Sequence, residues 1–209
     1  TWFDVAFLEL QRISWDSPAS LIEKLIRYEA VHDIKSWADV KNRLDEKDRR
    51  CYGFFHPRMP GVPLIFVEVA LTDAISDSIT PLLDESALPG VEKASTAIFY
   101  SISNTQTGLR GVSFGDSLIK RVVETLRAEF PKLKTFATLS PIPGLRQWMG
   151  QNAAGLLARL PEKQAEALGR LLGSMPPTAE RFLPALDDAL ALGPKSPLRQ
   201  ALLQCAAEY

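Results

Sequence analysis

The sequence predicts an α+β protein in which strands and flanking helices are followed by a helical subregion. Over residues 1–150, runs rich in β-branched and aromatic residues alternate with helical patterns and with turns that carry Gly and Pro, which is typical of strands and helices that share a core. Over residues 151–209, Ala and Leu dominate and prolines separate four helical patterns. This change of hydrophobic period places the boundary between the two parts near residue 150.

The composition is that of an ordinary globular protein and excludes several function classes. Of the 209 residues, 46% are apolar and 23% are charged, and the net charge of −1 argues against a basic nucleic-acid-binding protein. No apolar run approaches the roughly 18 residues of a membrane helix, and the N-terminus has no signal-peptide pattern. Two cysteines and two histidines would all have to converge to form a zinc site. We therefore expect a cytoplasmic protein with no metal and no nucleic-acid or membrane partner.

The first elements are a strand and two helices. Val, Phe, Leu and Ile mixed with polar residues predict a strand over 4–14. Ser17 and Pro18 have the residue types of an N-cap and of a first helical position, and apolar residues with helical spacing follow them. A shorter helix is predicted over 36–45, where the apolar residues lie on one face.

Three further strands are expected in the middle of the chain. Residues 51–56 and 64–71 are apolar and aromatic, and the segment 57–63 between them carries three prolines and a glycine, which predicts two strands joined by a turn. Residues 96–101 form another such run. Glu68 is a lone charge within an apolar strand, so we expect it to face solvent or to lie in an edge strand, with a functional carboxylate as the alternative.

The segment 106–139 contains a glycine-rich loop, a helix and a strand, and it is the most informative part of the sequence. The helix has a continuous apolar stripe and is followed by Pro131, and the next strand is predicted over 135–139. Ser113 lies where an N-cap would be expected. Three glycines occur within eight residues of the loop: Gly108, Gly111 and Gly115.

A glycine loop that opens a helix is a potential anion-binding site. Backbone N–H groups without helical partners point away from the helix N-terminus, which carries about half a positive charge. The stretch 108–134 has six basic and three acidic residues, which would favour a phosphorylated ligand. The pattern is neither a P-loop nor a clean GxGxxG motif. The alternative is a tight strand-to-helix junction with a solvated charged face.

The glycine loop and the sequence Ser-Pro-Ile-Pro-Gly at 140–144 together resemble the malonyl-CoA decarboxylase family. The resemblance is collinear from about residue 2 to residue 150 and is weaker in the helical region. Further stretches that resemble the family are 15–18, 29–37, 49–52, 63–72, 97–103 and 129–133.

The resemblance implies the fold of GCN5-related acetyltransferases, a mixed sheet with flanking helices, with an acetyltransferase-like catalytic core over 1–150 and with 151–209 as a helical subregion of the same catalytic domain. It implies that the loop 106–116 holds the pyrophosphate of CoA and that Lys120 or Arg121 reaches a CoA phosphate. The loop residues expected to bind the substrate in this way are Gln106, Gly108, Leu109, Arg110, Gly111 and Gly115.

The resemblance also implies a reaction, the conversion of malonyl-CoA to acetyl-CoA and CO2, in which the CoA ester is the substrate and no metal or organic cofactor takes part. Ser140 matches the catalytic serine of the family and is expected to donate a hydrogen bond to the malonyl carboxylate or to the developing enolate. The expected proton donor is a histidine beyond Tyr209, because neither His32 nor His56 matches the family motif. Animal members carry a glutamate where this chain has Ser113.

Several alternatives remain open at this point. A CoA-dependent acyltransferase would share the fold and the loop, and a non-catalytic acyl-CoA-binding module would bind CoA esters without forming a product.

The helical subregion is expected to mediate homo-oligomers, as the resemblance implies. The chain looks truncated at both ends, since it begins with Thr1 and stops at Tyr209 within an amphipathic pattern.

Overall fold

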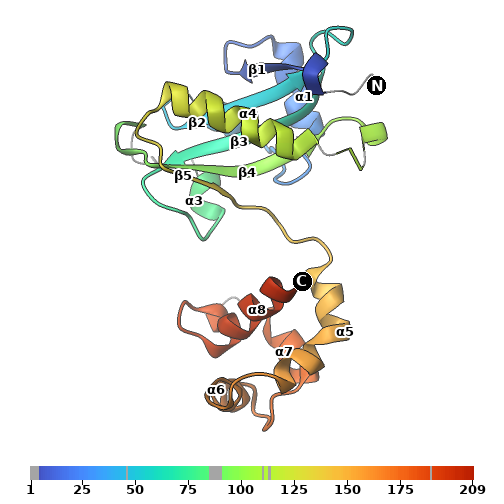
Figure 1. Ribbon diagram of the computed structural model, residues 1–209, viewed down its shortest axis with the longest axis vertical. Helices are drawn as coiled ribbons and strands as arrows, with labels where there is room; N and C mark the ends of the chain where they lie inside the picture. Colours follow the sequence, from blue (N-terminus) through green and yellow to red (C-terminus); the bar gives the residue numbers. More distant parts are fainter. Residues whose placement is uncertain (1–4, 46, 85–90, 110, 113, 189) are drawn as a thin grey trace. The chain divides into compact units, whose positions relative to one another are not determined.

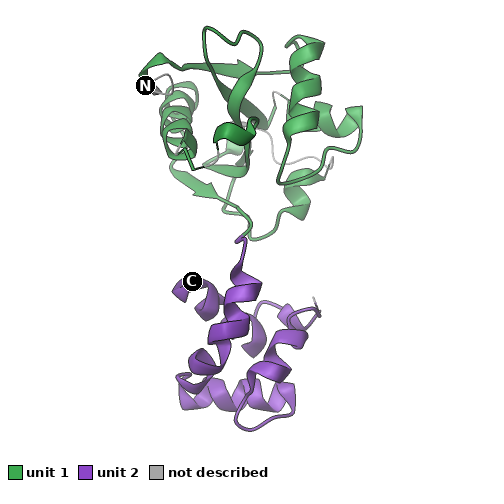
Figure 2. Ribbon diagram, turned by 90° about the vertical axis from the view of Figure 1, so that its right-hand side faces the viewer, with its two compact units in different colours: residues 1–141 green, residues 142–209 purple. Residues whose placement is uncertain are grey.

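In the computed structural model the chain divides into two compact units, residues 1–141 and residues 142–209 (Figure 2). The structure describes residues 5–209 except 46, 85–90, 110, 113 and 189. Each unit has a hydrophobic core of its own.

The first unit is built on one mixed sheet. Within the described residues the strand order follows the sequence, and neighbouring strands are antiparallel except for the last pair, which is parallel. This architecture confirms the predicted α+β class (Figure 1). The strands are β1 (Glu9–Ile13), β2 (Arg49–Phe55), β3 (Pro63–Thr72), β4 (Thr96–Asn104) and β5 (Thr135–Thr138). The predicted strand over 4–14 is shorter than expected, because a 3-10 turn occupies Val5–Phe7.

Helices cover both faces of the sheet (Figure 1). One face carries α4, and the opposite face carries α1 and α2 together with the short α3. The side chain of Ser36 caps α2, accepting a hydrogen bond from the Asp39 N–H at 3.1 Å. The bounds of these helices are α1 (Ala19–Tyr28), α2 (Trp37–Arg43), α3 (Thr80–Leu83) and α4 (Phe114–Glu129).

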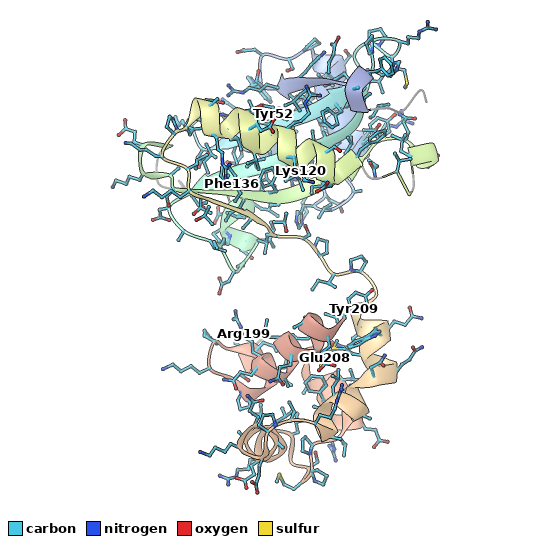
Figure 3. All side chains as sticks on the ribbon, viewed as in Figure 1. Tyr52, Lys120, Phe136, Arg199, Glu208 and Tyr209 are labelled. Atoms are coloured by element: carbon cyan, nitrogen blue, oxygen red, sulfur yellow. The ribbon has the colours of Figure 1, made fainter. Side chains whose placement is uncertain are left out.

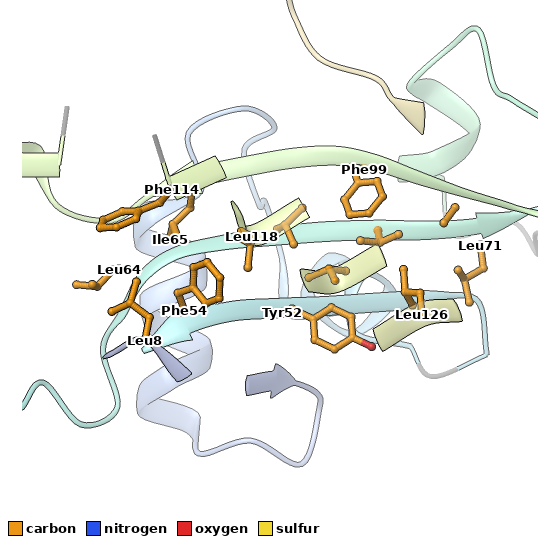
Figure 4. Close-up of a cluster of buried hydrophobic side chains, with 14 of the residues drawn as sticks. Leu8, Tyr52, Phe54, Leu64, Ile65, Leu71, Phe99, Phe114, Leu118 and Leu126 are labelled. Atoms are coloured by element: carbon orange, nitrogen blue, oxygen red, sulfur yellow. The ribbon is translucent and has the colours of Figure 1, made fainter. Parts of the chain in front are cut away.

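The apolar stripe predicted for 106–139 forms the core between α4 and the sheet (Figure 4). Leu118, Val122 and Leu126 of α4 are completely buried and pack among side chains such as Phe54 and Phe99 of the sheet. The helix ends at Glu129, two residues before Pro131. The 3.6-residue period of the stripe therefore identified both the helix and its buried face.

Strand β3 lies at the centre of the sheet, and all ten of its residues are buried. The expected solvent-facing or edge position of Glu68 is therefore wrong: its side chain is 1% exposed. The physical reason is that helices cover both faces of β3, so each side chain points into a core and the usual alternation of polar and apolar residues is lost.

Strand β4 contains a bulge at Tyr100. In the pairing of β3 with β4, Glu68 is opposite Ser101 but the next residue, Val69, is opposite Phe99. Tyr100 is thus an extra residue in β4, and such a residue bends a strand and interrupts its regular pairing. The bulge divides β4 into a first part, Thr96–Phe99, and a second part, Ser101–Asn104.

The second unit is helical, as its composition predicted. Its core contains the buried side chains of Met149, Leu168, Phe182 and Leu198. Its helices are α5 (Leu145–Ala158), α6 (Glu162–Leu172), α7 (Ala179–Ala185) and α8 (Pro197–Glu208). Throughout the described part of the chain, no helix has the length and apolar character needed to cross a membrane.

Candidate functional site

Two segments predicted to be functional follow the carboxyl ends of the two parallel strands. Strand β5 pairs with β4 from Thr96↔Thr135 to Phe99↔Thr138, and the Leu139 N–H continues this ladder by donating to the Phe99 carbonyl at 2.9 Å. Ser140 is the next residue and is exposed. The structure thus places Ser140 where β5 leaves β4, directly beside the bulge.

Strand β4 continues beyond this point while β5 does not. Ser101–Asn104 pair with β3 on one side, and no strand within the described residues pairs with them on the other side. From Tyr100 to Asn104 this open edge is about 13 Å long at the usual rise per residue of a strand. Backbone N–H and C=O groups along such an edge can bind an extended ligand that carries amides.

The glycine loop follows the far end of this edge. The Leu109 N–H donates to the Gln106 carbonyl at 3.0 Å, and the buried Leu109 side chain anchors the loop in the core below α4. Gly108 and Gly111 are exposed, and a side chain at either would meet open space. Gly111 has φ +83°, a conformation that L residues rarely adopt.

The remaining glycine of the loop has a different environment. Gly115 lies in the first turn of α4, where a Cβ atom would be 3.8 Å from Ile102 and 4.0 Å from Ile65, so the helix start lies against the sheet beside the open edge. Arg110 and Ser113, for which a binding role and a capping role were predicted, lie outside the described residues.

The two basic residues predicted to reach a phosphate have different surroundings. The Lys120 side chain is 71% exposed on α4 (Figure 3), and its Nζ lies 2.8 Å from Asp116 Oδ2. Arg121 donates from Nη1 to the Leu8 carbonyl at 3.2 Å, and its guanidinium lies 5.5 Å from the centre of the Phe54 ring. Lys120 is therefore exposed in a surface ion pair, whereas Arg121 is held against the sheet.

Glu68 is paired within the core. Its Oε2 lies 3.2 Å from Arg43 Nη1, and both side chains are at most 2% exposed. Burial raises the pKa of Glu68 to about 7, and the negative charge of Glu29 acts in the same direction. A carboxyl group with such a pKa can exchange a proton near neutral pH.

The two histidines lie in different places. His32 follows α1, its ring centre is 6.5 Å from that of Tyr100, and its buried Nε2 has no hydrogen-bond partner among the described residues. His56 lies in the turn after β2, where its Nδ1 accepts a hydrogen bond from the Arg58 N–H at 3.1 Å. The structure thus brings His32, but not His56, to the bulge of β4.

A comparison with known protein families identifies the domain to which these segments belong. Residues 6–205 match the model of the malonyl-CoA decarboxylase C-terminal domain.

The chain belongs to the malonyl-CoA decarboxylase family.

Individual members of the family agree with this assignment. The chain is 45% identical over 172 residues to the mitochondrial malonyl-CoA decarboxylase of Anser anser anser, covering 81% of this chain and 32% of that protein. It is 47% identical over 151 residues to the mitochondrial enzyme of Mus musculus, covering 71% of this chain and 30% of that protein. The crystal structure of malonyl-CoA decarboxylase from Cupriavidus metallidurans matches with a TM-score of 0.82 and 49% identity, covering 100% of this chain and 49% of that one.

The chain spans about a third of the length of these curated relatives and about half of the solved structure. The family assignment therefore applies to the domain that is present here.

A buried polar cluster in this malonyl-CoA decarboxylase domain was missed by the sequence reasoning. It lies on the face of the sheet that carries α1 and α2 and surrounds the carboxylates of Glu29 and Glu68. The signal available in the sequence is the pair of serines Ser101 and Ser103, which alternate with apolar residues in a strand. Their partner Glu29 is 72 residues away from Ser101, so no local pattern connects them.

Proposed function

We propose that the chain is the catalytic domain of an enzyme that converts malonyl-CoA to acetyl-CoA and CO2. Membership of the family supports this reaction. The structural observation that carries the proposal is the divergence of β5 from β4, which leaves an open strand edge between the glycine loop and Ser140. A CoA ester has a phosphorylated end, an extended arm with two amides and a reactive thioester, in the same order as these three features.

The phosphorylated end of the substrate would bind at the start of α4. The proposed contacts come from the helix N-terminus and from the loop residues Gln106, Gly108, Leu109, Arg110, Gly111 and Gly115. A phosphate would also attract a basic side chain, and Lys120 is the better candidate because Arg121 is engaged with Leu8 and Phe54. A side chain at Gly111 would meet open space, and the absence of one in glycine leaves room for a phosphate to approach the backbone.

The arm of the substrate would follow the second part of β4. Its amides can pair with the open edge as an added strand would. With the pyrophosphate at the start of α4, the roughly 13 Å of edge from Asn104 back to Tyr100 would bring the thioester to the bulge. Ser140 follows the last hydrogen bond of the β4–β5 ladder at that position.

The chemistry at the thioester requires stabilisation of negative charge. When the bond between the carboxylate carbon and the α-carbon breaks, its electron pair moves into the thioester carbonyl and gives an enolate, and CO2 leaves. The Ser140 hydroxyl would donate a hydrogen bond to the malonyl carboxylate or to the enolate oxygen. The α-carbon then takes up a proton to give acetyl-CoA, and we propose that a histidine outside residues 1–209 donates it.

The test is product analysis on the protein expressed with whatever sequence flanks the chain in its gene. Malonyl-CoA is supplied without any acceptor, and the CoA species are followed by mass spectrometry. We expect acetyl-CoA to form. Release of free CoA that depends on an added amine would favour an acyltransferase instead, and binding without any product would favour an acyl-CoA-binding module.

The role of Ser140 is tested by Ser140→Ala. We expect kcat to fall about 100-fold or more, because one hydrogen bond to the developing charge is lost. The dissociation constant for free CoA should change by less than about twofold, because the contacts of the phosphorylated end remain. Ser20→Ala, at an exposed serine of α1, is the matched control. Unchanged turnover in Ser140→Ala would remove Ser140 from the mechanism.

The cytoplasmic location and the homo-oligomeric state remain predictions. The relatives from Anser anser anser and Mus musculus are named as mitochondrial. Fractionation of cells that produce the protein and light scattering on the purified protein would test the two predictions separately.

A further inference from the structure

We propose that Glu29 is a positioning residue for decarboxylation. Its buried carboxylate ties the segment 29–33, which joins α1 to the following turn, to the second part of β4. It thereby holds the strand edge on which the thioester is aligned. This inference rests on the proposed function, because it concerns the placement of the same substrate.

The first half of the evidence is the way in which Glu29 organises its own segment. Glu29 follows the last residue of α1 and is 8% exposed. Its Oε1 accepts hydrogen bonds from the N–H groups of Val31 and His32, both at 2.9 Å. The carboxylate thus closes a turn directly after the helix and fixes the backbone that carries His32.

The second half is that the same carboxylate binds β4 beyond the bulge. Ser101 Oγ lies 2.7 Å from Oε1 and 2.8 Å from Oε2, and Ser103 Oγ donates to Oε2 at 3.2 Å. The Ala30 N–H donates in turn to Ser103 Oγ at 3.1 Å. Both serines are 1% exposed, so these bonds are shielded from water and are correspondingly strong.

The location of these contacts is what gives them a role beyond general stability. Before the bulge, β4 is held between β3 and β5, whereas after it the described strands provide only β3 as a partner. The second part of β4 therefore depends on contacts from the faces of the sheet to keep its place. Glu29 supplies such contacts at two successive inward-facing residues, Ser101 and Ser103.

A second tether holds the other end of the same segment. Arg43 Nη2 donates to the Asp33 carbonyl at 3.2 Å, while Nη1 of the same guanidinium lies 3.2 Å from Glu68. Glu68 is opposite Ser101 in the β3–β4 register. Segment 29–33 is thus fixed to β4 through Glu29 at one end and to β3 through Arg43 and Glu68 at the other, on either side of His32.

The consequence concerns catalysis rather than binding of the phosphorylated end. Ser101, which Glu29 binds, is next to the bulge and to the end of the β4–β5 ladder, whereas the glycine loop begins after Asn104 at the other end of β4. Breaking the hydrogen bonds of Glu29 with Ser101 and Ser103 should shift the thioester relative to Ser140. Small displacements of reacting groups lower rates strongly.

The test compares Glu29→Gln with Glu23→Gln, an exposed glutamate on the same helix α1. Gln preserves the size of the side chain but removes the charge and one of the two acceptor oxygens. In the protein expressed with its native flanking sequence, we expect kcat for malonyl-CoA to fall about 10- to 100-fold in Glu29→Gln. The KM and the dissociation constant of free CoA should change by less than about threefold, and Glu23→Gln should behave as wild type.

Two further measurements separate positioning from loss of folded protein. Turnover is normalised to the number of CoA-binding sites measured by calorimetry, so that unfolded molecules do not count. Ser101→Ala with Ser103→Ala keeps the Glu29 carboxylate and its bonds to Val31 and His32, and should lower kcat in the same direction. Combining the serine and glutamate substitutions should lower kcat little further, because all of them break the same hydrogen bonds between Glu29 and the two serines.

The outcomes are distinct. If wild type forms acetyl-CoA and Glu29→Gln turns over equally fast per CoA-binding site, the positioning role is wrong and the proposed function stands. If kcat per site is unchanged but CoA-binding sites are lost, Glu29 is a folding residue only. If wild type forms no acetyl-CoA, the proposed function fails and this inference fails with it.

Discussion

The two faces of the sheet are built on different physical principles. The face under α4 is apolar, with Leu118, Val122 and Leu126 packed on the strands. The face under α1 and α2 combines apolar packing with a buried polar cluster around Glu29 and Glu68. Apolar packing is non-directional and tolerates small shifts, whereas hydrogen bonds and ion pairs require defined positions. Both faces therefore contribute to stability, and the second also defines where particular backbone segments lie.

The largest loss of unfolding free energy is expected when Arg43, on the polar face, is replaced. Arg43→Ala would leave Glu68 buried without its ionic partner, and we expect the free energy of unfolding to fall by about 3–5 kcal/mol at pH 8. The loss should be smaller at pH 5, where Glu68 can take up a proton and become neutral. Urea unfolding at the two pH values measures the difference, with Lys41→Ala at an exposed position of α2 as the control. Equal losses at both pH values would contradict an ionic role for the pair.

A somewhat smaller effect is expected from the apolar face. Leu118 is completely buried, and Leu118→Ala should lower the free energy of unfolding by about 3 kcal/mol through the cavity it leaves. No charge is involved, so the loss should be the same at pH 5 and pH 8. The same urea titrations test this. A pH-dependent loss of unfolding free energy in Leu118→Ala would contradict the proposed contrast between the two faces.

The smallest change in the free energy of unfolding is expected from Glu68→Gln. This substitution removes a single titrating group from the polar face. The pKa of Glu68 is about 7 in the folded protein against an ordinary value of 4.5. The folded state therefore binds more protons than the unfolded state between these values, and its stability falls as the pH rises through that window. Removing the carboxyl group should make the fall between pH 4.5 and pH 7 shallower by about 2.5 kcal/mol. An unchanged slope would contradict the raised pKa.

The predictability of the site differs among its parts for a physical reason. The anion-binding pattern at Gly108–Gly115 and the position of Ser140 at a strand end are local features, and both could be read from neighbouring residues. The environment of Glu68 could not, because a charge in an apolar run looks the same whether the strand is central or at an edge. The different surroundings of Lys120 and Arg121, which are adjacent in sequence, became visible only when Leu8 and Phe54 were placed beside Arg121.

The sequence by itself determined the alternation of strands and helices, the buried stripe of α4, the helical character of the second unit and the family. These follow from hydrophobic periods and motifs that act over a few residues. Only the tertiary structure decided that β5 leaves β4 beside Ser140, that β3 is covered on both faces, and that Glu29 binds Ser101 across 72 residues of sequence. Such contacts depend on how whole strands and helices are brought together, which no local period specifies.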